Sequence, residues 1–417
     1  MKFTPKSLRL QIGIFGRMNV GKSSLLNMVS GQDVSITSDI PGTTTDVVEK
    51  TMELLPVGPV VFLDTAGLDD SSVLGHKRIK KTEKIFGRSE IIILLVEADI
   101  WSDYEENIIK EAKRRETPVI IIINKVDLKY PSDDFLNLIS TKSVSHQLIT
   151  STDIKNRDKY VKPLKEKILD ISPEDFRNPP PIINDLIPRG GIAILIIPID
   201  LEAPKGRIIL PQVQTIRDAL DGDQIAIIVK ESEYRQTLKS LKRKPDIVIC
   251  DSQVVDFMID NTPSGVNATT FSTLFSRYKG DIVEEIKGVF AIDRLKPEDK
   301  VLIAEACSHH PIEDDIGRVK IPKWLKDYLG FDLKWDSTAG RDYPDNLSDY
   351  KMIIHCGACM ITRHEMLSRV QMAIEKGVAI SNYGIVISYL KGVLERVLSP
   401  IPQAQELFIK YREEIKR

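Results

Sequence analysis

The first third of the chain alternates short apolar runs with polar and amphipathic segments. Three of these segments are short and strand-like, namely Leu8–Phe15, Val60–Leu63 and Val119–Ile123, and the last consists wholly of β-branched residues. Each is followed directly by glycine, aspartate or asparagine, which end regular structure or carry chemistry. This pattern predicts an α/β domain in which buried strands deliver polar residues to one edge of a sheet.

The remaining two thirds repeat the same pattern after a proline-rich interruption. Apolar runs predict strands at Ile192–Ile197, Gln224–Val229, Asp246–Cys250, Val301–Ala304, Met352–Ile354 and Val378–Ile380. Amphipathic segments between them predict helices, and this alternation favours mainly parallel sheets. We therefore expect an α/β chain with a first domain over 1–172, a linker over 173–190, a middle α/β domain over 191–261 and a third α/β domain over 262–417.

Composition narrows the class of protein without identifying it. The 417 residues are 42% hydrophobic and 28% charged, with a formal net charge of -2. That balance is typical of globular proteins and lacks the basic excess that nucleic acid favours, so we expect no nucleic-acid partner. No apolar run reaches about 18 residues, so we expect neither membrane insertion nor a signal peptide, and a cytoplasmic location.

The segment after the first predicted strand matches the phosphate-binding pattern G-x-x-x-x-G-K-[ST] in its required strand-to-helix context. Gly16 and Gly21 let backbone N–H groups curl around a phosphate, Lys22 adds a positive charge and Ser23 is placed to bind Mg²⁺. The residues expected to contact the nucleotide here are Gly16, Asn19, Val20, Gly21, Lys22, Ser23 and Ser24.

Two later segments select the nucleotide. The second strand delivers Asp64-Thr65-Ala66-Gly67, in which Asp64 can hold the magnesium shell and the N–H of Gly67 can sense a γ-phosphate. The third delivers Asn124-Lys125-Val126-Asp127, whose carboxylate can accept two hydrogen bonds from guanine but not from adenine. For the loop that stacks on guanine, the best candidates are Ser151 and Thr152. The order of the motifs predicts a P-loop GTPase domain over 1–172, with Lys22, Asp64 and Gly67 among its catalytic residues.

Three of the four cysteines lie in two clusters that directly follow predicted strands of the third domain. The clusters are Cys307-Ser308-His309-His310 and His355-Cys356-Gly357-Ala358-Cys359. Parallel strands present their carboxyl ends at one edge, so Cys307, Cys356 and Cys359 should meet there. The fourth, Cys250, ends an apolar strand and is expected to be a core residue.

Thiolate spacing alone leaves the metal open. A structural zinc site of Cys3His type would use the three cysteines with His309 or His355. A 4Fe-4S cluster would use the same thiolates and leave one iron for a histidine, another donor or a guest molecule. We therefore treat His309 and His355 as candidates for either a fourth ligand or a supporting position.

The first domain resembles the TrmE-Era-Obg branch of GTPases through Gly16–Ser24, Gly42-Thr43-Thr44-Thr45-Asp46 and Asp64–Leu68. This resemblance implies that Thr44 closes over Mg²⁺ when GTP is bound and acts in catalysis, and that Asn19 holds an activating K⁺. Leu68 stands where Ras-like enzymes carry the glutamine that orients water, so intrinsic hydrolysis should be slow.

The whole chain resembles the HydF family of FeFe-hydrogenase maturation GTPases, because Cys307-x-His309 and His355-Cys356-x-x-Cys359 follow such a GTPase domain. The resemblance implies a 4Fe-4S cluster in the third domain and a homodimer formed by the middle domain. It also implies a scaffold that receives a two-iron precursor, made with two radical-SAM maturases, and delivers it to FeFe-hydrogenase. The alternative is an RNA- or ribosome-associated GTPase with a structural Cys3His zinc site.

Overall fold

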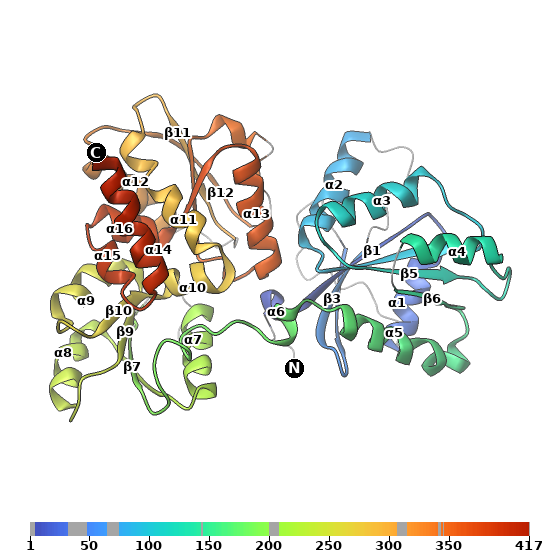
Figure 1. Ribbon diagram of the computed structural model, residues 1–417, viewed down its shortest axis with the longest axis horizontal. Coiled ribbons are helices and arrows are strands. Elements are labelled where there is room, and N and C mark those ends of the chain that lie inside the picture. Colours follow the sequence, from blue (N-terminus) through green and yellow to red (C-terminus); the bar gives the residue numbers. More distant parts are fainter. Residues whose placement is uncertain are drawn as a thin grey trace. The chain divides into compact units, whose positions relative to one another are not determined.

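The computed structural model describes residues 5–31, 48–64, 75–142, 145–199, 208–306, 315–340, 343–344 and 346–416, except for the side chains of residues 6, 75–81 and 416. It divides into two compact units, residues 1–179 and 180–417 (Figure 1). Among the described residues, no helix combines the length and apolar character needed to cross a bilayer.

The first unit is built on a six-stranded sheet in the order β2-β3-β1-β4-β5-β6. Only β2 runs antiparallel to its neighbour, and the other pairs are parallel. The strands are β1 (Leu10–Gly16), β2 (Val48–Leu54), β3 (Gly58–Asp64), β4 (Ile91–Glu97), β5 (Val119–Asn124) and β6 (Ser145–Leu148). The helices are α1 (Lys22–Ser30), α2 (Gly75–Arg88), α3 (Asp103–Arg114), α4 (Asp133–Lys142), α5 (Arg157–Ile171) and α6 (Glu174–Arg177).

Alternating side chains along β1, β4 and β5 enter two separate cores. Ile12, Ile93 and Ile122 pack with α1 and α5 on one face of the sheet. Their neighbours in the sequence, such as Leu94 and Ile123, pack with α2, α3 and α4 on the other. Both faces are thus covered by helices, as a mainly parallel sheet requires.

The second unit holds two four-stranded sheets, each wholly parallel, in the orders β10-β9-β7-β8 and β12-β11-β13-β14. The first consists of β7 (Ile192–Ile196), β8 (Ile225–Val229), β9 (Ile247–Cys250) and β10 (Asn267–Thr270). The second consists of β11 (Lys300–Ala304), β12 (Lys334–Thr338), β13 (Met352–His355) and β14 (Ala379–Asn382). The predicted class, a P-loop domain followed by α/β regions with mainly parallel sheets, is confirmed.

The helices of this unit are α7 (Leu210–Asp221), α8 (Glu231–Ser240), α9 (Val255–Asn261), α10 (Phe271–Lys279), α11 (Ile282–Val289), α12 (Ile321–Leu329), α13 (Arg363–Glu375), α14 (Tyr383–Leu390), α15 (Leu394–Val397) and α16 (Pro402–Lys416). One core joins both sheets, since Ile194 and Val248 of the first belong to the same cluster as Ile303 and Ile354 of the second.

The first of these sheets extends beyond residue 261, where we expected the middle domain to end. β10 pairs with β9 in register from Asn267 to Thr270 and so completes that sheet. The short run Ala268-Thr269-Thr270 is fully buried, and its β-branched residues suit a strand. In the sequence, a four-residue strand leaves too weak a pattern to separate it from α10.

Candidate functional site: a phosphate-binding loop and a cysteine loop

The phosphate-binding loop connects the end of β1 to the start of α1. Gly16 and Gly21 have φ angles of 151° and 103°, a region that favours glycine. A Cβ at Gly21 would lie 2.2 Å from Nδ2 of Asn124. Lys22 is buried, and its Nζ donates to the carbonyl oxygens of Gly16, at 2.5 Å, and Arg17, at 2.9 Å. The loop therefore curls around its own lysine at a helix N-terminus, the geometry that suits a phosphate group.

Two further predicted residues are Asp64, at the end of β3, and Ser23, in the first turn of α1. Asp64 ends β3 opposite Ile14 of β1, and its side chain is buried. Ser23, in the first turn of α1, has an exposed side chain. The carboxylate and the hydroxyl are of the types that bind Mg²⁺. Thr44 and Gly67 lie outside the described residues.

Asn124, at the end of β5, connects the phosphate-binding loop to the loop that contains Ser151. Its Nδ2 donates to the carbonyl oxygen of Val20 at 2.7 Å and to Oγ of Ser151 at 3.0 Å. Its Oδ1 accepts from the backbone N–H of Ser151 at 3.0 Å. The structure thus brings Ser151 to the phosphate-binding loop, whereas the side chain of Thr152 is exposed.

Of the remaining guanine-selecting residues, Asp127 is exposed and Lys125 is half-buried. The side chain of Asp127 is exposed, where a base can reach it, and Nζ of Lys125 lies 2.6 Å from Oε1 of Glu97. Asn19 is exposed with a φ of 61°, and Ser24 is half-buried in the first turn of α1.

One ion pair at this site was not predicted from the sequence. The Nε of Arg17 donates to Oε1 of Glu105 at 2.7 Å, and its Nη2 donates to Oε2 at 2.8 Å. Burial opposes ionisation of Glu105, but hydrogen bonds from Arg17 and from the backbone lower the pKa of this carboxyl overall. Ser102-x-x-Glu105 is a capping box at the start of α3, a recognisable signal for Glu105 though not for its arginine partner.

The second candidate site lies at the carboxyl edge of the β12-β11-β13-β14 sheet. Ala304, His355 and Asn382 are aligned across β11, β13 and β14, and Cys356 follows β13 directly. The Cys356 Sγ accepts the N–H of Ala306 at 3.1 Å, and it also accepts the N–H of Ala358. Both cysteines of the Cys-x-x-Cys loop are partly buried and neither forms a disulfide.

Burial raises the pKa of both thiols. For Cys356, the backbone N–H groups of Ala306 and Ala358 oppose this effect. For Cys359, burial and the nearby Cys356 raise the pKa to about 11, while the charge of Lys279 opposes the rise. Thiolates at this loop therefore need a cation, and a metal centre would supply it.

His355 connects the cysteine loop to Arg369 of α13. It is fully buried, and its ring nitrogens lie 2.8 Å from the carbonyl oxygen of Cys356 (Nδ1) and 2.9 Å from Nη1 of Arg369 (Nε2). Because arginine only donates, Nε2 accepts and Nδ1 donates. Burial and the charge of Arg369 lower the pKa of His355 to about 3. Of the two roles expected for His355, this geometry matches the supporting one, since both ring nitrogens are already engaged.

Asn382 and Tyr383, which also lie at this edge, make structural contacts. Asn382 accepts the N–H of Gly384 at 2.7 Å and so caps α14, and the hydroxyl of Tyr383 lies 3.4 Å from Oε1 of Glu305. Cys307 and His309 lie outside the described residues. Within the described ranges, no three His, Cys, Asp or Glu side chains gather closely enough to hold a metal ion.

A mainly parallel sheet with a phosphate-binding loop after β1 and a guanine-selecting motif after β5 defines a P-loop GTPase. Residues 11–125 match the family model described as 50S ribosome-binding GTPase. The first unit is therefore a GTPase domain, which binds and hydrolyses GTP. Residues 182–280 and 283–400 match the dimerization and tetramerization domains of hydrogen maturase F. These matches cover 99 and 118 residues, together 217 of 417, and the chain belongs to the hydrogen maturase F family.

Curated relatives match the GTPase domain. The tRNA modification GTPase MnmE of Synechococcus sp. (strain JA-3-3Ab) is 39% identical over 129 residues, which are 30% of this chain and 27% of that protein. GTPase Der of Persephonella marina is 31% identical over 183 residues, 41% and 40% of the two chains. The chain thus spans about a quarter to two fifths of the length of these relatives.

A similar solved structure is that of Era from Aquifex aeolicus bound to GDP and AlF4-, 31% identical with a TM-score of 0.32. The similarity covers 39% of this chain and 57% of that one. The two hydrogen maturase F descriptions name self-association, so the second unit contains the regions through which this family forms oligomers.

Proposed function

We propose that this protein is a GTP-hydrolysing scaffold of FeFe-hydrogenase maturation that carries a 4Fe-4S cluster on Cys307, Cys356 and Cys359. In this role it receives a two-iron precursor made with two radical-SAM maturases and delivers it to FeFe-hydrogenase. The observation that carries the proposal is the Cys356-x-x-Cys359 loop at a sheet edge, within a region that matches hydrogen maturase F.

The described part of the loop suits such a cluster. Two N–H groups point at the sulfur of Cys356, an arrangement that stabilises a thiolate bound to metal. The cluster would supply an iron site with an exchangeable position, while the chain holds the thiolates and shapes the pocket around them. His309 remains a proposed fourth ligand or supporting residue.

GTP is proposed to control the exchange of partners. Lys22, Ser23 and Asp64 would hold GTP and Mg²⁺, Thr44 and Gly67 would respond to the γ-phosphate, and Asn19 would hold K⁺. Asn124, Lys125 and Asp127 would select guanine, with Ser151 and Thr152 beside the base. A nucleotide shifts such an equilibrium only by binding two conformations with different affinity. Slow hydrolysis would keep the GTP-bound form long enough for a partner to bind.

A homodimer through the middle domain is supported by an exposed apolar edge strand. β8 is at the edge of its sheet, and Ile225 and Ile228 on it are 49% and 51% exposed. Val213 and Leu220 of the contacting helix α7 are also exposed. An uncharged apolar edge of this kind invites pairing with a second chain. The region carrying it matches the family's dimerization domain.

The alternative is a zinc-containing GTPase that acts on RNA or the ribosome. Its support comes from the GTPase domain, whose relatives include a tRNA modification enzyme. The second unit favours the scaffold, because its matches are to hydrogen maturase F. A reducing compartment such as the cytoplasm is part of this proposal, since thiolate ligands must stay unpaired.

Two cysteine substitutions test the proposal. Cys356→Ala should remove the iron-dependent absorbance of the anaerobically reconstituted protein, because one of three thiolates is lost. Cys250→Ala is the matched control, since Cys250 is fully buried in β9 and should leave the iron content unchanged. A full iron complement in Cys356→Ala would contradict the ligand assignment.

A further inference from the structure

The last turn of α10 lies against the Cys-x-x-Cys loop. Lys279 is 2% exposed, and its Nζ donates to the carbonyl oxygen of Ile361 at 2.7 Å and to those of Ala358 and Cys359 at 3.4 Å each. Burying an ammonium group is costly unless its hydrogen bonds are made. The loop backbone around the two thiols is thus organised about one buried cation.

A second cation makes the reverse connection. Arg363, the first residue of α13, donates from Nη1 to the carbonyl oxygen of Tyr278 at 2.7 Å and to those of Arg277 and Gly280 at 3.4 Å each. These carbonyls belong to the end of α10, where backbone acceptors lack partners within the helix. Lys279 at the end of α10 thus binds carbonyl oxygens of the cysteine loop, and Arg363, two residues after that loop, binds carbonyl oxygens at the end of α10.

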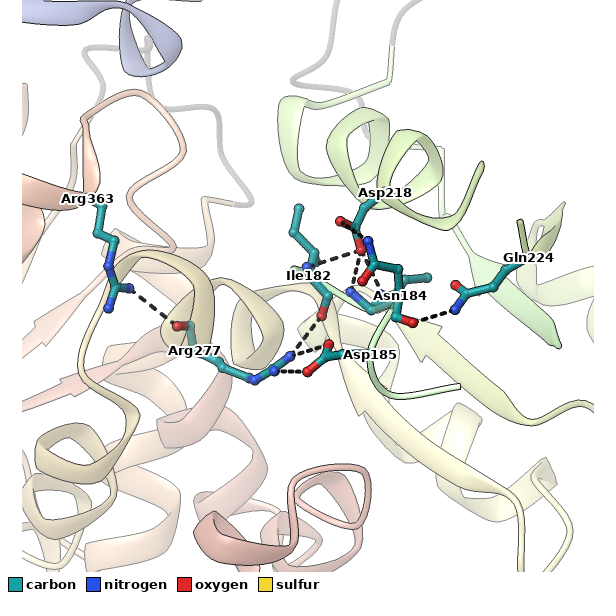
Figure 2. Close-up of polar contacts among 8 residues, drawn as sticks. Ile182, Asn184, Asp185, Asp218, Gln224, Arg277 and Arg363 are labelled. Carbon is teal, nitrogen blue, oxygen red and sulfur yellow. Dashed lines mark hydrogen bonds and ion pairs between the residues drawn. The ribbon is translucent and has the colours of Figure 1, made fainter. Parts of the chain in front are cut away.

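The same helix end is held from its other side by the segment 182–187, as Figure 2 shows. Arg277 forms an ion pair with Asp185, and its Nη1 lies 3.4 Å from the carbonyl oxygen of Ile182. Asp218 accepts the backbone N–H groups of Ile182, Ile183 and Asn184 at 3.1, 2.7 and 2.9 Å. The side chains of Ile182, Ile183 and Ile187 pack in one core with Phe275 of α10. The end of α10 is thus held by polar and apolar contacts to this segment as well as by its contacts with the cysteine loop.

We propose that Lys279 is a positioning residue of the cluster site, which fixes the backbone of residues 356–361 and places a positive charge beside the cysteine thiolates. An anionic cluster held by three thiolates gains from such a charge, which favours the reduced form. The proposal rests on the proposed function, because it assumes that these thiolates bind a cluster.

Two variants separate the structural effect from the electrostatic one. Lys279→Met removes the charge and the hydrogen bonds with similar side-chain length, and Lys279→Arg restores a cation. Lys287→Met is the control, because this substitution removes an equal charge from another helix. Lys287 lies on α11 and pairs with Glu284. If Lys279→Met fails to fold, Arg363→Met tests the same contact between the end of α10 and the segment that follows the cysteine loop.

The first readout is amide hydrogen exchange in the metal-free full-length protein. We expect peptides over residues 356–361 to exchange about tenfold faster in Lys279→Met, with other segments unchanged. The second readout is the reduction potential of the reconstituted cluster, expected to become more negative in Lys279→Met and to return toward the wild-type value in Lys279→Arg. Lys287→Met should match the wild type in both.

The outcomes separate this inference from the proposed function. If the wild-type protein binds no iron, the proposed function itself is wrong. A wild type that binds the cluster, together with a Lys279→Met variant that matches it in both readouts, would overturn only the role of Lys279. If Lys279→Met does not fold, unchanged exchange at the loop in Arg363→Met would overturn it.

Discussion

At the scale of single residues, the second unit contains a carboxyl group that is buried without a cationic partner in the described part of the chain. Glu285 on α11 is fully buried, and Ser276 of α10 donates a hydrogen bond to its Oε2. Burial raises the pKa of Glu285 to about 8, although the hydrogen bond from Ser276 opposes this rise. The folded protein thus keeps this carboxyl protonated at neutral pH.

The raised pKa of Glu285 predicts that the folded protein loses stability as pH rises. The ordinary value is 4.5, so between pH 4.5 and about 8 the unfolded chain releases this proton while the folded chain retains it. The contribution of Glu285 to the free energy of unfolding is fully present below pH 4.5 and is lost as pH rises toward the folded-state pKa. From pH 5 to pH 8 the loss amounts to up to about 4 kcal/mol, at about 1.4 kcal/mol per unit.

Glu285→Gln should abolish this dependence, because an amide does not ionise. Thermal melts at pH 5 and pH 8 should show the variant gaining stability relative to the wild type as pH rises. Glu284→Gln removes a neighbouring, more exposed carboxylate and serves as the control. A stability difference between Glu285→Gln and the wild type that does not change with pH would show that Glu285 ionises normally in the folded chain.

At the scale of elements, the second unit depends on the close approach of α11 to β14. A Cβ at Gly288 would lie 1.9 Å from the carbonyl oxygen of Ile380 and 2.7 Å from its carbonyl carbon. Both are backbone atoms of β14, so they cannot move aside as a flexible side chain would. The absence of a side chain at Gly288 sets the distance between this helix and the sheet.

Gly288→Ala should therefore destabilise the second unit by about 3 kcal/mol or more, although alanine is the better helix former. Denaturant unfolding measures the change. Val283→Ala, at an exposed position of the same helix, should change stability by less than about 0.5 kcal/mol. Equal effects of the two substitutions would mean that α11 can shift away from β14 at little cost.

The elements that the sequence predicts best are those with strong local patterns. The apolar runs around Ile122 and Ile354 are confirmed as strands β5 and β13, and the loop after Gly16 leads into a helix as its motif requires. β10 was missed because it has only four residues. The contacts of Lys279 and Arg363 with carbonyl oxygens were also missed, because backbone acceptors carry no residue-type signal.

At the scale of the whole molecule, the second unit combines the dimerization and tetramerization regions of one family in a single packed unit. Ile194 of the dimerization region and Ile303 of the tetramerization region share a hydrophobic core. Lys391 of the later region also forms an ion pair with Asp256 of the earlier one. A change in one region is therefore expected to reach the other through packed side chains, since such cores deform little.

We propose that one chain holds both a GTPase domain and an iron-sulfur centre, and metal analysis of the wild-type protein purified without oxygen distinguishes that centre from a zinc site. We predict about four irons per chain, little zinc, and a paramagnetic signal after reduction, as a 4Fe-4S cluster gives. One zinc per chain in a colourless protein without such a signal would mean that the cysteines form a structural zinc site and hold no iron-sulfur cluster.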